Sequence, residues 1–450
     1  MKGNELFMET ENDKLVKSLL ERTFFTAWKR ENINKEKFGN YVTLEVQMNA
    51  KCDLACKYCY YERYGSELYP LKISGNSLVM KNFEMLLNWL EENQLFPRIE
   101  PFSGEIFSQN IGFKLVDRLL DFYIKNDLTS SPQHYVVIPT NATFIFSDKK
   151  TKEVENLLNK AKDNNIPMYL SLSVDGKFVE NENRPFKSGK LRDDEYYDKL
   201  FAFAKKWNFS FHPMIYSNGV EKWIDNFLWF QEMFKKYDIP FFYIYLLEVR
   251  NVEWTKQQIK DFYKFMRFIC NYYYNFVGIS GNDFIKYVTE VKLSNIFSLF
   301  YRVGRGTGCS VQSAMQLRLG DLTHSICHRA AYKPHNLWKF KTDENKIIGI
   351  EALNAPLFLS HQTMDEDNFP MCESCFIKYL CNGQCLGSMN ETNGSLFAPI
   401  PTVCALEHAK MAAVVDECIS LDILKDWYPF VRPEVQETIK IYYDRFWKEK

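Results

Sequence analysis

The stretch that decides the fold is Lys51-Cys52-Asp53-Leu54-Ala55-Cys56-Lys57-Tyr58-Cys59-Tyr60, in which three thiols stand at the spacing C-x3-C-x2-C. Iron–sulfur clusters are bound by cysteine thiolates, usually by four of them. Tetrahedral zinc sites tend instead to use paired C-x2-C units with two further ligands downstream. The tight trio of Cys52, Cys56 and Cys59 therefore indicates a 4Fe–4S cluster with one iron left open to a small molecule. The alternative is a chance group of buried or zinc-binding cysteines.

Composition sets the broad class of the protein. The chain has 450 residues, of which 46% are hydrophobic, so more than one domain is expected. The net charge of −1 gives no attraction to nucleic acid or to a membrane surface. No apolar run reaches the roughly eighteen residues of a membrane span, and Glu5, Glu9 and Glu11 stand where a signal peptide would be apolar. A cytoplasmic protein is expected, in which twelve cysteines favour metal binding over disulfides.

Short apolar runs alternate with amphipathic segments after residue 40. The expected strands are 41–47, 98–102, 135–140, 168–174, 209–216 and 241–247. The expected helices are 76–94, 110–126, 148–164, 193–206 and 220–237. This alternation predicts parallel strands with crossover helices, and hence an α/β fold built as a partial (β/α)6 TIM barrel. Chemistry in such barrels lies at the carboxyl ends of the strands, and the cysteine stretch follows the first one. A doubly wound open sheet is the alternative.

The segments outside the expected barrel are assigned from their composition. Apolar residues recur at helical spacing near 13–29, and aromatic residues fill 255–300, so both segments are expected to be helical. Gly304, Gly306 and Gly308 mark a boundary. The expected divisions are 1–40, a helical extension; 41–254, the barrel; 255–303, a helical linker; 304–405, a cysteine-rich domain; and 406–450, a helical tail. Cys270 and Cys418 lie in apolar helical patterns and are expected to be buried structural thiols.

The cysteine spacing, with Tyr58 just before the third thiol, resembles the signature of the radical S-adenosylmethionine (SAM) superfamily. The resemblance implies that SAM binds the open iron. Phe102-Ser103-Gly104-Glu105-Ile106 resembles the family's Gly-Gly-Glu-Pro-like turn, which holds the methionine amino group, and the Glu105 carboxylate is suited to an ammonium. Pro139-Thr140-Asn141 is similar to the family's Thr-Asn-Gly strand end.

The fourth strand end, Ser171-Leu172-Ser173-Val174-Asp175-Gly176, resembles the Ser-x-Asp-Gly strand end of the sulfatase-maturing and peptide-modifying branch. The resemblance implies that Ser173 and Asp175 bond the ribose hydroxyls and that Arg184 pairs with the SAM carboxylate. The expected SAM-binding residues are Tyr58, Ser103, Gly104, Glu105, Asn141, Ser173, Asp175 and Arg184.

A second group of thiols lies toward the C-terminus. Its pattern is Cys372-x2-Cys375-x5-Cys381-x3-Cys385, followed by Cys404, with Cys309 and Cys327 upstream. Seven thiols exceed the needs of one metal site. Two zinc ions in a zinc ribbon are one interpretation.

This second pattern resembles the SPASM domain, which holds two auxiliary 4Fe–4S clusters. The resemblance implies an outer cluster on Cys372, Cys375, Cys381 and Cys404, and an inner cluster on Cys309, Cys327 and Cys385. Relatives have a further cysteine where Val303 stands, so the inner cluster is one protein thiolate short. Candidates for its fourth ligand are a substrate thiol or amide, water, Asp321, His324 or His328.

The resemblance covers residues 45–405 and implies a radical SAM enzyme with three 4Fe–4S clusters. Its substrate would be a ribosomally made peptide, its product a thioether or a carbon–carbon or carbon–heteroatom cross-link, and its electron donor a flavodoxin or ferredoxin. One alternative is an anaerobic sulfatase-maturing enzyme. That branch has an aspartate base where His328 stands. A second alternative is a zinc-bound, non-catalytic binding protein.

Overall fold

The computed structural model describes residues 9–35, 42–129, 131–277, 314–331, 333–362, 369–381, 384–424, 428 and 433–448. The chain divides into two compact units. The first unit comprises Met1–Ala55, Cys59–Ser171 and Ser310–Thr363. The second comprises Cys56–Tyr58, Leu172–Cys309 and Met364–Lys450. The expected domain borders remain predictions, and Cys309 and Val303 lie outside the described residues.

The first unit is built on parallel strands around β1 (Thr43–Gln47). β2 (Arg98–Phe102) pairs in parallel with one edge of β1, and β7 (Ala314–Arg318) pairs in parallel with the other edge. The register places Glu45 of β1 opposite Glu100 of β2 and Gln316 of β7. Because β1 is covered on both edges, the cysteine stretch that follows it starts from the interior of a sheet.

Three antiparallel strands extend this sheet beyond β7. They are β8 (Thr323–Ser325), β9 (Asn336–Asp343) and β10 (Lys346–Ala352), and among the described residues the strand order is β10-β9-β8-β7-β1-β2. These strands fall within 304–405, the range in which the sequence placed a separate cysteine-rich domain. The compact first unit includes Ser310–Thr363, and β7 of this range pairs with β1.

The N-terminal helix predicted near 13–29 is two helices, α1 (Glu11–Arg22) and α2 (Phe24–Trp28), separated at Thr23. Thr10 and Asp13 form a capping box that fixes the start of α1. The Asp13 carboxylate also accepts a hydrogen bond from the backbone N of Ala352 at 2.7 Å. α1 thereby packs against β10 and α13 (Ala355–Gln362).

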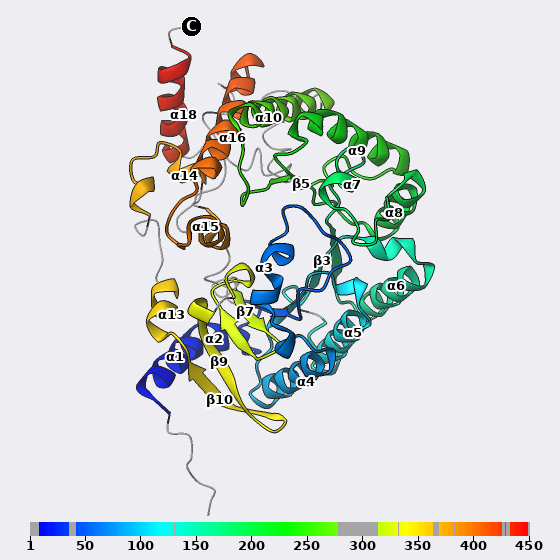
Figure 1. The fold of residues 1–450 in the computed structure, drawn as a ribbon, viewed down its shortest axis with the longest axis vertical. Helices are drawn as coiled ribbons and strands as arrows, with labels where there is room; N and C mark the ends of the chain where they lie inside the picture. Colours follow the sequence, from blue (N-terminus) through cyan, green and yellow to red (C-terminus); the bar gives the residue numbers. More distant parts are fainter. Residues whose placement is uncertain are drawn as a thin grey trace, which may run out of the picture. The chain divides into compact units, whose positions relative to one another are not determined.

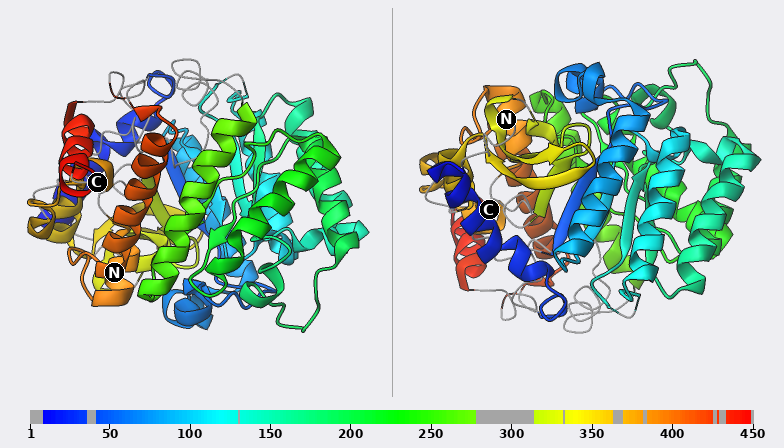
Figure 2. Two further views of the ribbon diagram at one scale, coloured as in Figure 1. Left: turned by 90° about the horizontal axis from the view of Figure 1, so that it is seen from above. Right: turned by 90° about the horizontal axis from the view of Figure 1, so that it is seen from below.

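The remaining elements of the first unit follow the predicted alternation. They are α3 (Tyr60–Leu68), α4 (Asn76–Glu92), α5 (Asn110–Lys125), β3 (Val136–Thr140), α6 (Asp148–Asp163) and β4 (Met168–Leu172). Helices α4, α5 and α6 lie side by side, each with an apolar face turned inward (Figure 2). Their predicted bounds are confirmed within two residues because their apolar stripes are strongly periodic.

The second unit continues the alternation with shorter strands. Its elements are α7 (Glu180–Asn183), α8 (Asp194–Trp207), β5 (Met214–Ile215), α9 (Trp223–Tyr237), β6 (Leu247–Glu248), α10 (Lys256–Val277), α14 (Lys378–Cys381), α15 (Leu386–Asn393), α16 (Pro401–Ser420) and α18 (Pro433–Phe446). The strands predicted over 209–216 and 241–247 are reduced to β5, β6 and single bridges from Leu172 to Phe211 and from Phe211 to Ile244. Pro213 explains part of the loss, since it has no N–H for a ladder.

Long helices pack closely in the second unit. α10 and α16 run side by side (Figure 1), and Arg267 of α10 pairs with Glu417 of α16 at 2.7 Å. Cys270 and Cys418 are buried on these helices, as predicted.

Short 3-10 helices occur in both units, at Leu71–Ile73, Ile106–Ser108, Thr143–Phe146, Val220–Lys222, His328–Ala330, Lys333–His335 and Pro370–Cys372. No helix in the described ranges is both long and apolar enough to cross a membrane.

Candidate cofactor site

The cysteine stretch is anchored to the end of β2 by backbone hydrogen bonds. Met48 N donates to the Phe102 carbonyl at 2.9 Å, and Glu105 N donates to the Lys51 carbonyl at 2.9 Å. The chain after β1 therefore runs alongside the chain after β2 up to the residue before the first cysteine. This pairing brings the predicted Ser-Gly-Glu turn to the base of the cysteine stretch.

Ser103 and Gly104 support the cysteine stretch directly. The Ser103 hydroxyl donates to the Asn49 carbonyl at 3.0 Å. A Cβ on Gly104 would lie 2.5 Å from the carbonyl oxygens of both Ala50 and Lys51, so only glycine fits there. Both residues were predicted to bind SAM, and the contacts seen here give them a role in shaping the loop.

Glu105 is a buried carboxylate whose partners are all neutral. Its oxygens accept hydrogen bonds from Phe107 N (3.0 Å), Thr140 Oγ1 (2.9 Å) and Asn141 N (2.6 Å). In the part of the chain that the structure describes, no cationic side chain pairs with it. Burial raises the pKa of Glu105 to about 7, with a further push from Asp53, although the hydrogen bonds oppose the rise. A buried carboxylate without a countercharge fits a cationic ligand.

Asn141 links this carboxylate to the first cysteine. Its side-chain amide donates to Asp53 Oδ1 at 2.9 Å and to the Cys52 sulfur at 3.6 Å, and Leu54 N donates to the same sulfur at 3.4 Å. N–H groups directed at sulfur favour the thiolate, the form that binds iron. Cys59 stands at the N-cap of α3.

Tyr58 belongs to a buried polar network in the second unit. Its hydroxyl donates to Asp175 Oδ2 at 2.6 Å, and Met214 N donates to Asp175 Oδ1 at 2.9 Å. Arg184 Nη1 lies 3.5 Å from Asp175 Oδ1 and 3.3 Å from the Tyr58 hydroxyl. The network joins the Cys56–Tyr58 segment to the end of β4. Asp175 and Arg184, both predicted to contact SAM, already have protein partners.

The same network includes Glu180 and Arg192, which sequence reasoning missed. Glu180 is completely buried, and its Oε1 lies 3.6 Å from Arg184 Nε and 3.3 Å from Arg192 Nη2. The spacing of Glu180 and Arg184, four residues apart on a short helix, is the signal that was available. Ser173, also predicted to contact SAM, is half-buried.

The cysteines predicted to hold the outer cluster share one neighbourhood in the second unit. Burial raises the pKa of Cys404, and the nearby thiols Cys372 and Cys375 raise it further. Burial also raises the pKa of Cys381, with contributions from Glu407, Cys404 and Cys372. Gln384 Nε2 donates to the Cys404 sulfur at 3.1 Å. Iron binding would stabilise Cys381 and Cys404 as thiolates.

Two cysteines predicted to bind the inner cluster belong to different units. Cys385 is the N-cap of α15 in the second unit, and Cys327 is buried in the first unit. His408 Nε2 lies 3.7 Å from the Cys375 sulfur. Within the described ranges, no three His, Cys, Asp or Glu side chains are placed to hold a single metal ion.

His328 lies over the polar face of the first unit's sheet. Its Nδ1 is 3.1 Å from Glu45 Oε1, and its backbone N donates to Gln316 Oε1 at 2.6 Å. The imidazole stacks on Phe102 with ring centres 4.6 Å apart, and Tyr60 lies at 5.4 Å. An imidazole hydrogen-bonded to a carboxylate is a candidate proton acceptor. Glu45 was not predicted, although an acid in the middle of a buried strand was the available signal.

Two other candidates for the inner cluster are engaged elsewhere in the first unit. Asp321 forms a 2.7 Å ion pair with Arg318. His324 is buried, with Nδ1 2.8 Å from the Gln316 carbonyl, and burial lowers the pKa of His324 to about 3. Their roles as iron ligands remain predictions.

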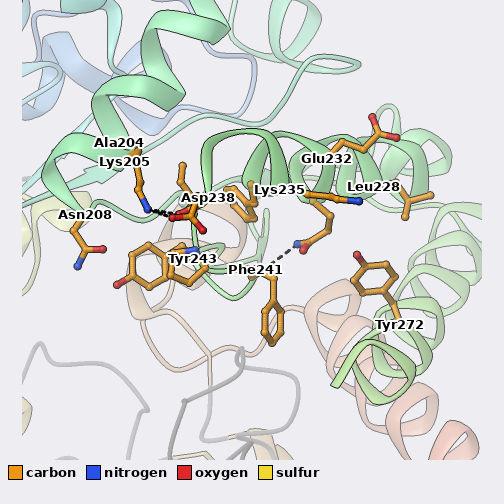
Figure 3. Close-up of a pocket in the computed structure, with 14 residues that line it drawn as sticks. Ala204, Lys205, Asn208, Leu228, Glu232, Lys235, Asp238, Phe241, Tyr243 and Tyr272 are labelled. Atoms are coloured by element: carbon orange, nitrogen blue, oxygen red, sulfur yellow. Dashed lines mark hydrogen bonds and ion pairs between the residues drawn. The ribbon is translucent and has the colours of Figure 1, made fainter. Parts of the chain in front are cut away.

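A pocket of about 850 Å³ in the second unit lies apart from these residues. The ends of α8 and α9 and the chain that follows α9 form it, with Phe241, Tyr243 and Tyr272 among its aromatic lining (Figure 3). Lys205 and Asp238 pair at 2.6 Å within it. None of the predicted site residues lines this pocket, so it is not the candidate cofactor site.

Comparison with known proteins gives structural likeness and no sequence match. No protein-family model matches the chain, and no curated protein matches it. A structure of anSMEcpe with bound AdoMet and Kp18Cys peptide matches with a TM-score of 0.55 and 16% identity, over 84% of this chain and 98% of that one. A second anSMEcpe structure, with AdoMet and Cp18Cys peptide, matches with a TM-score of 0.52 and 15% identity, over 89% and 99%.

Streptococcus suis SuiB bound to precursor peptide SuiA matches with 16% identity over 83% of this chain and 79% of that one. Its TM-score of 0.44 does not establish a shared fold. The two anSMEcpe matches span most of both chains. The predicted fold class is therefore confirmed, and the chain has the α/β fold of anSMEcpe, a protein whose structures hold AdoMet and a peptide.

Proposed function

We propose that the chain is a radical SAM enzyme that oxidatively modifies a peptide. The observation that carries the proposal is Glu105, a buried carboxylate that pairs with no cationic side chain among the described residues and is joined through Asn141 to the sulfur of Cys52. SAM carries an ammonium group that would supply the missing charge. The fold shared with an AdoMet-binding protein supports the same cofactor.

The cysteines and the neighbouring polar residues have different proposed roles in cofactor binding. Cys52, Cys56 and Cys59 would ligate a 4Fe–4S cluster, and Glu105 would orient SAM by its ammonium. When bound, SAM and the cluster supply a 5′-deoxyadenosyl radical that removes hydrogen from an unactivated carbon. Tyr58 and Asp175 would keep the Cys56–Tyr58 segment in place through their 2.6 Å hydrogen bond.

The proposed auxiliary site would receive the electron that the modified peptide loses. Cys372, Cys375, Cys381 and Cys404 supply a complete set of four thiolates. An inner cluster on Cys309, Cys327 and Cys385 would have one iron open to a substrate thiol. A flavodoxin or ferredoxin is the proposed electron donor, and a thioether or a carbon–carbon or carbon–heteroatom cross-link is the proposed product.

Sulfatase maturation is the second candidate, and the likeness to peptide-bound anSMEcpe favours it. Against it stands His328, where that branch has an aspartate base. The reaction would then depend on the His328–Glu45 pair as proton acceptor. Mass spectrometry of the treated peptide separates the two candidates, because formylglycine formation from cysteine loses the sulfur whereas a thioether keeps it.

The proposal is tested by 5′-deoxyadenosine release under dithionite from anaerobically reconstituted protein. The wild type is expected to release it and to hold about twelve irons per chain, four for each of three clusters. The Cys52→Ala/Cys56→Ala/Cys59→Ala variant is expected to release none, while Cys270→Ala, which removes a buried thiol outside both groups, keeps the activity. Release by the triple variant, or zinc in place of iron, would contradict the proposal.

A further inference from the structure

A group of four charged side chains lies between β6 and α16 in the second unit; three of them are buried, and the fourth, Arg250, is 28% exposed. We call Glu248, Arg250, Glu407 and Lys410 the charge quartet. Arg250 Nη2 lies 2.6 Å from Glu248 and 2.9 Å from Glu407, and Lys410 Nζ lies 3.0 Å from Glu248 and 3.3 Å from Glu407. The side chains of Glu248, Glu407 and Lys410 are at most 8% exposed.

Stability alone is a poor explanation for the charge quartet. Removing four charges from water is costly, and well-packed apolar residues often stabilise a core equally well. The quartet has two carboxylates and two cations, so its formal charge sums to zero. Its parts nevertheless face different groups, and a neutral arrangement of fixed charges still produces a local field.

The charge quartet adjoins the C-terminal cysteines. Glu407 stands on α16 one turn after Cys404. Asn251, next to Arg250, donates to Glu391 Oε2 at 3.1 Å, and Glu391 lies on α15, the helix that Cys385 caps.

The ion pairs of the quartet extend this placement to Arg250. Arg250 Nη2 lies 2.9 Å from Glu407, the residue one turn after Cys404 on α16. Two opposite charges therefore lie together beside the same proposed iron ligand.

We propose that the charge quartet sets the reduction potential of the proposed outer iron–sulfur cluster, which Cys381 and Cys404 would help to bind, with Arg250 raising that potential and Glu407 lowering it. The inference rests on the proposed function, because it presupposes clusters on these cysteines. A cluster gains negative charge when it takes up an electron, so a nearby cation stabilises the reduced form and a nearby anion destabilises it. Arg250 and Glu407 are positioning residues in this role, since neither ligates iron.

The test uses the full chain with Cys52→Ala/Cys56→Ala/Cys59→Ala, so that only auxiliary clusters give a signal. Arg250→Gln and Glu407→Gln are each added to this parent, and midpoint potentials are measured by electron paramagnetic resonance during a redox titration. We expect one auxiliary signal to titrate at a more negative potential in Arg250→Gln and at a less negative potential in Glu407→Gln. Distortion of the fold would not give shifts that follow the sign of the charge removed.

Two controls isolate the effect of charge at this place. Arg250→Lys keeps the positive charge and is expected to stay near the parent potential. Arg267→Gln removes a cation that pairs with Glu417 on the same helix, α16, and is expected to leave the potential unchanged. Equal potentials in parent and both quartet variants, or shifts of the same sign, would overturn the inference. Should Arg250→Gln not fold, an unchanged potential in Glu407→Gln overturns it alone.

Failure of the inference is distinguishable from failure of the proposed function. A parent protein that holds iron–sulfur clusters but shows no charge-dependent shift rejects only the role of the charge quartet. A parent protein without auxiliary clusters after reconstitution rejects both, because no redox centre would then lie at Cys381 and Cys404.

Discussion

Glu105 and Glu248 are both buried glutamates near the carboxyl ends of strands, yet their surroundings are opposite. Within the described ranges, the donors that Glu105 accepts hydrogen bonds from are uncharged, and burial raises its pKa to about 7. Burial also acts on Glu248, but Lys410 and Arg250 outweigh it and hold the pKa of Glu248 far below its usual range. The comparison teaches that Glu248 has its countercharges within the protein, whereas Glu105, the proposed SAM-binding carboxylate, would receive its countercharge from the ligand.

The largest expected effect is a loss of folding stability when a carboxylate of the charge quartet is removed. Glu248→Ala leaves Arg250 and Lys410 buried with one carboxylate between them. We expect a loss of about 3–5 kcal/mol in the free energy of unfolding, measured by denaturant titration. Lys264→Ala, which removes a partner of an exposed ion pair on α10, is the control and should change stability little. A stability loss in Glu248→Ala no larger than in this control would contradict the comparison.

The next largest expected effect is on the affinity for SAM at the proposed site around Glu105. Glu105→Ala removes the proposed partner of the ammonium, so affinity is expected to fall by about 2–5 kcal/mol, roughly 30-fold to several thousand-fold. Anaerobic calorimetric titration of cluster-loaded protein measures it. Glu84→Ala, which breaks a surface pair with Arg118 in the same unit, is the matched control. Equal SAM affinity in wild type and Glu105→Ala would remove Glu105 from the site.

The smallest effect is a pH dependence of opposite sign at the two glutamates. The pKa of Glu105 is higher in the folded SAM-free protein than in the unfolded chain, where it is about 4.3. Its contribution is therefore favourable below about pH 4.3 and is lost as pH rises toward 7, by at most about 1.4 kcal/mol per pH unit. The pKa of Glu248 is lowered, so its contribution is present above about pH 4.3 and is lost in acid.

Denaturant unfolding of wild type and Glu105→Gln between about pH 5 and 7 isolates the first effect. The wild type should lose stability relative to the variant as pH rises through this window. Added SAM should weaken that trend because its ammonium favours the ionised carboxylate. A difference that stays constant with pH would mean that the Glu105 carboxyl does not titrate in this range.

Much of the fold could be predicted because its signals are local. The helices α4, α5 and α6 were predicted from apolar periodicity, and β2 was predicted without error over Arg98–Phe102. The parallel pairing of β7 with β1 was not predicted. It joins residues that are far apart in the sequence, and no local pattern specifies such a partner.

The candidate site shows the same division. The identity and order of Cys52, Glu105 and Asp175 along successive strand ends could be predicted from the sequence. Asp175 is already hydrogen-bonded to Tyr58 and Met214, whereas Glu105 has uncharged partners in the part of the chain that the structure describes, and this difference depends on contacts between distant segments. Sequence reasoning therefore identified the polar residues but not which of them are free for a ligand.

The pairing of β1 on both edges has a consequence for loss of the proposed cluster. The strand before the first cysteine is held by backbone ladders to β2 and β7, none of which depends on iron. In zinc fingers, by contrast, metal binding and folding are one event, and chelation unfolds the domain. We expect the amides of Leu44 and Val46 to exchange with solvent only in the rarest openings, with or without a cluster. Oxidative loss of the proposed cluster would then leave the sheet around β1 folded, so that a new cluster could bind.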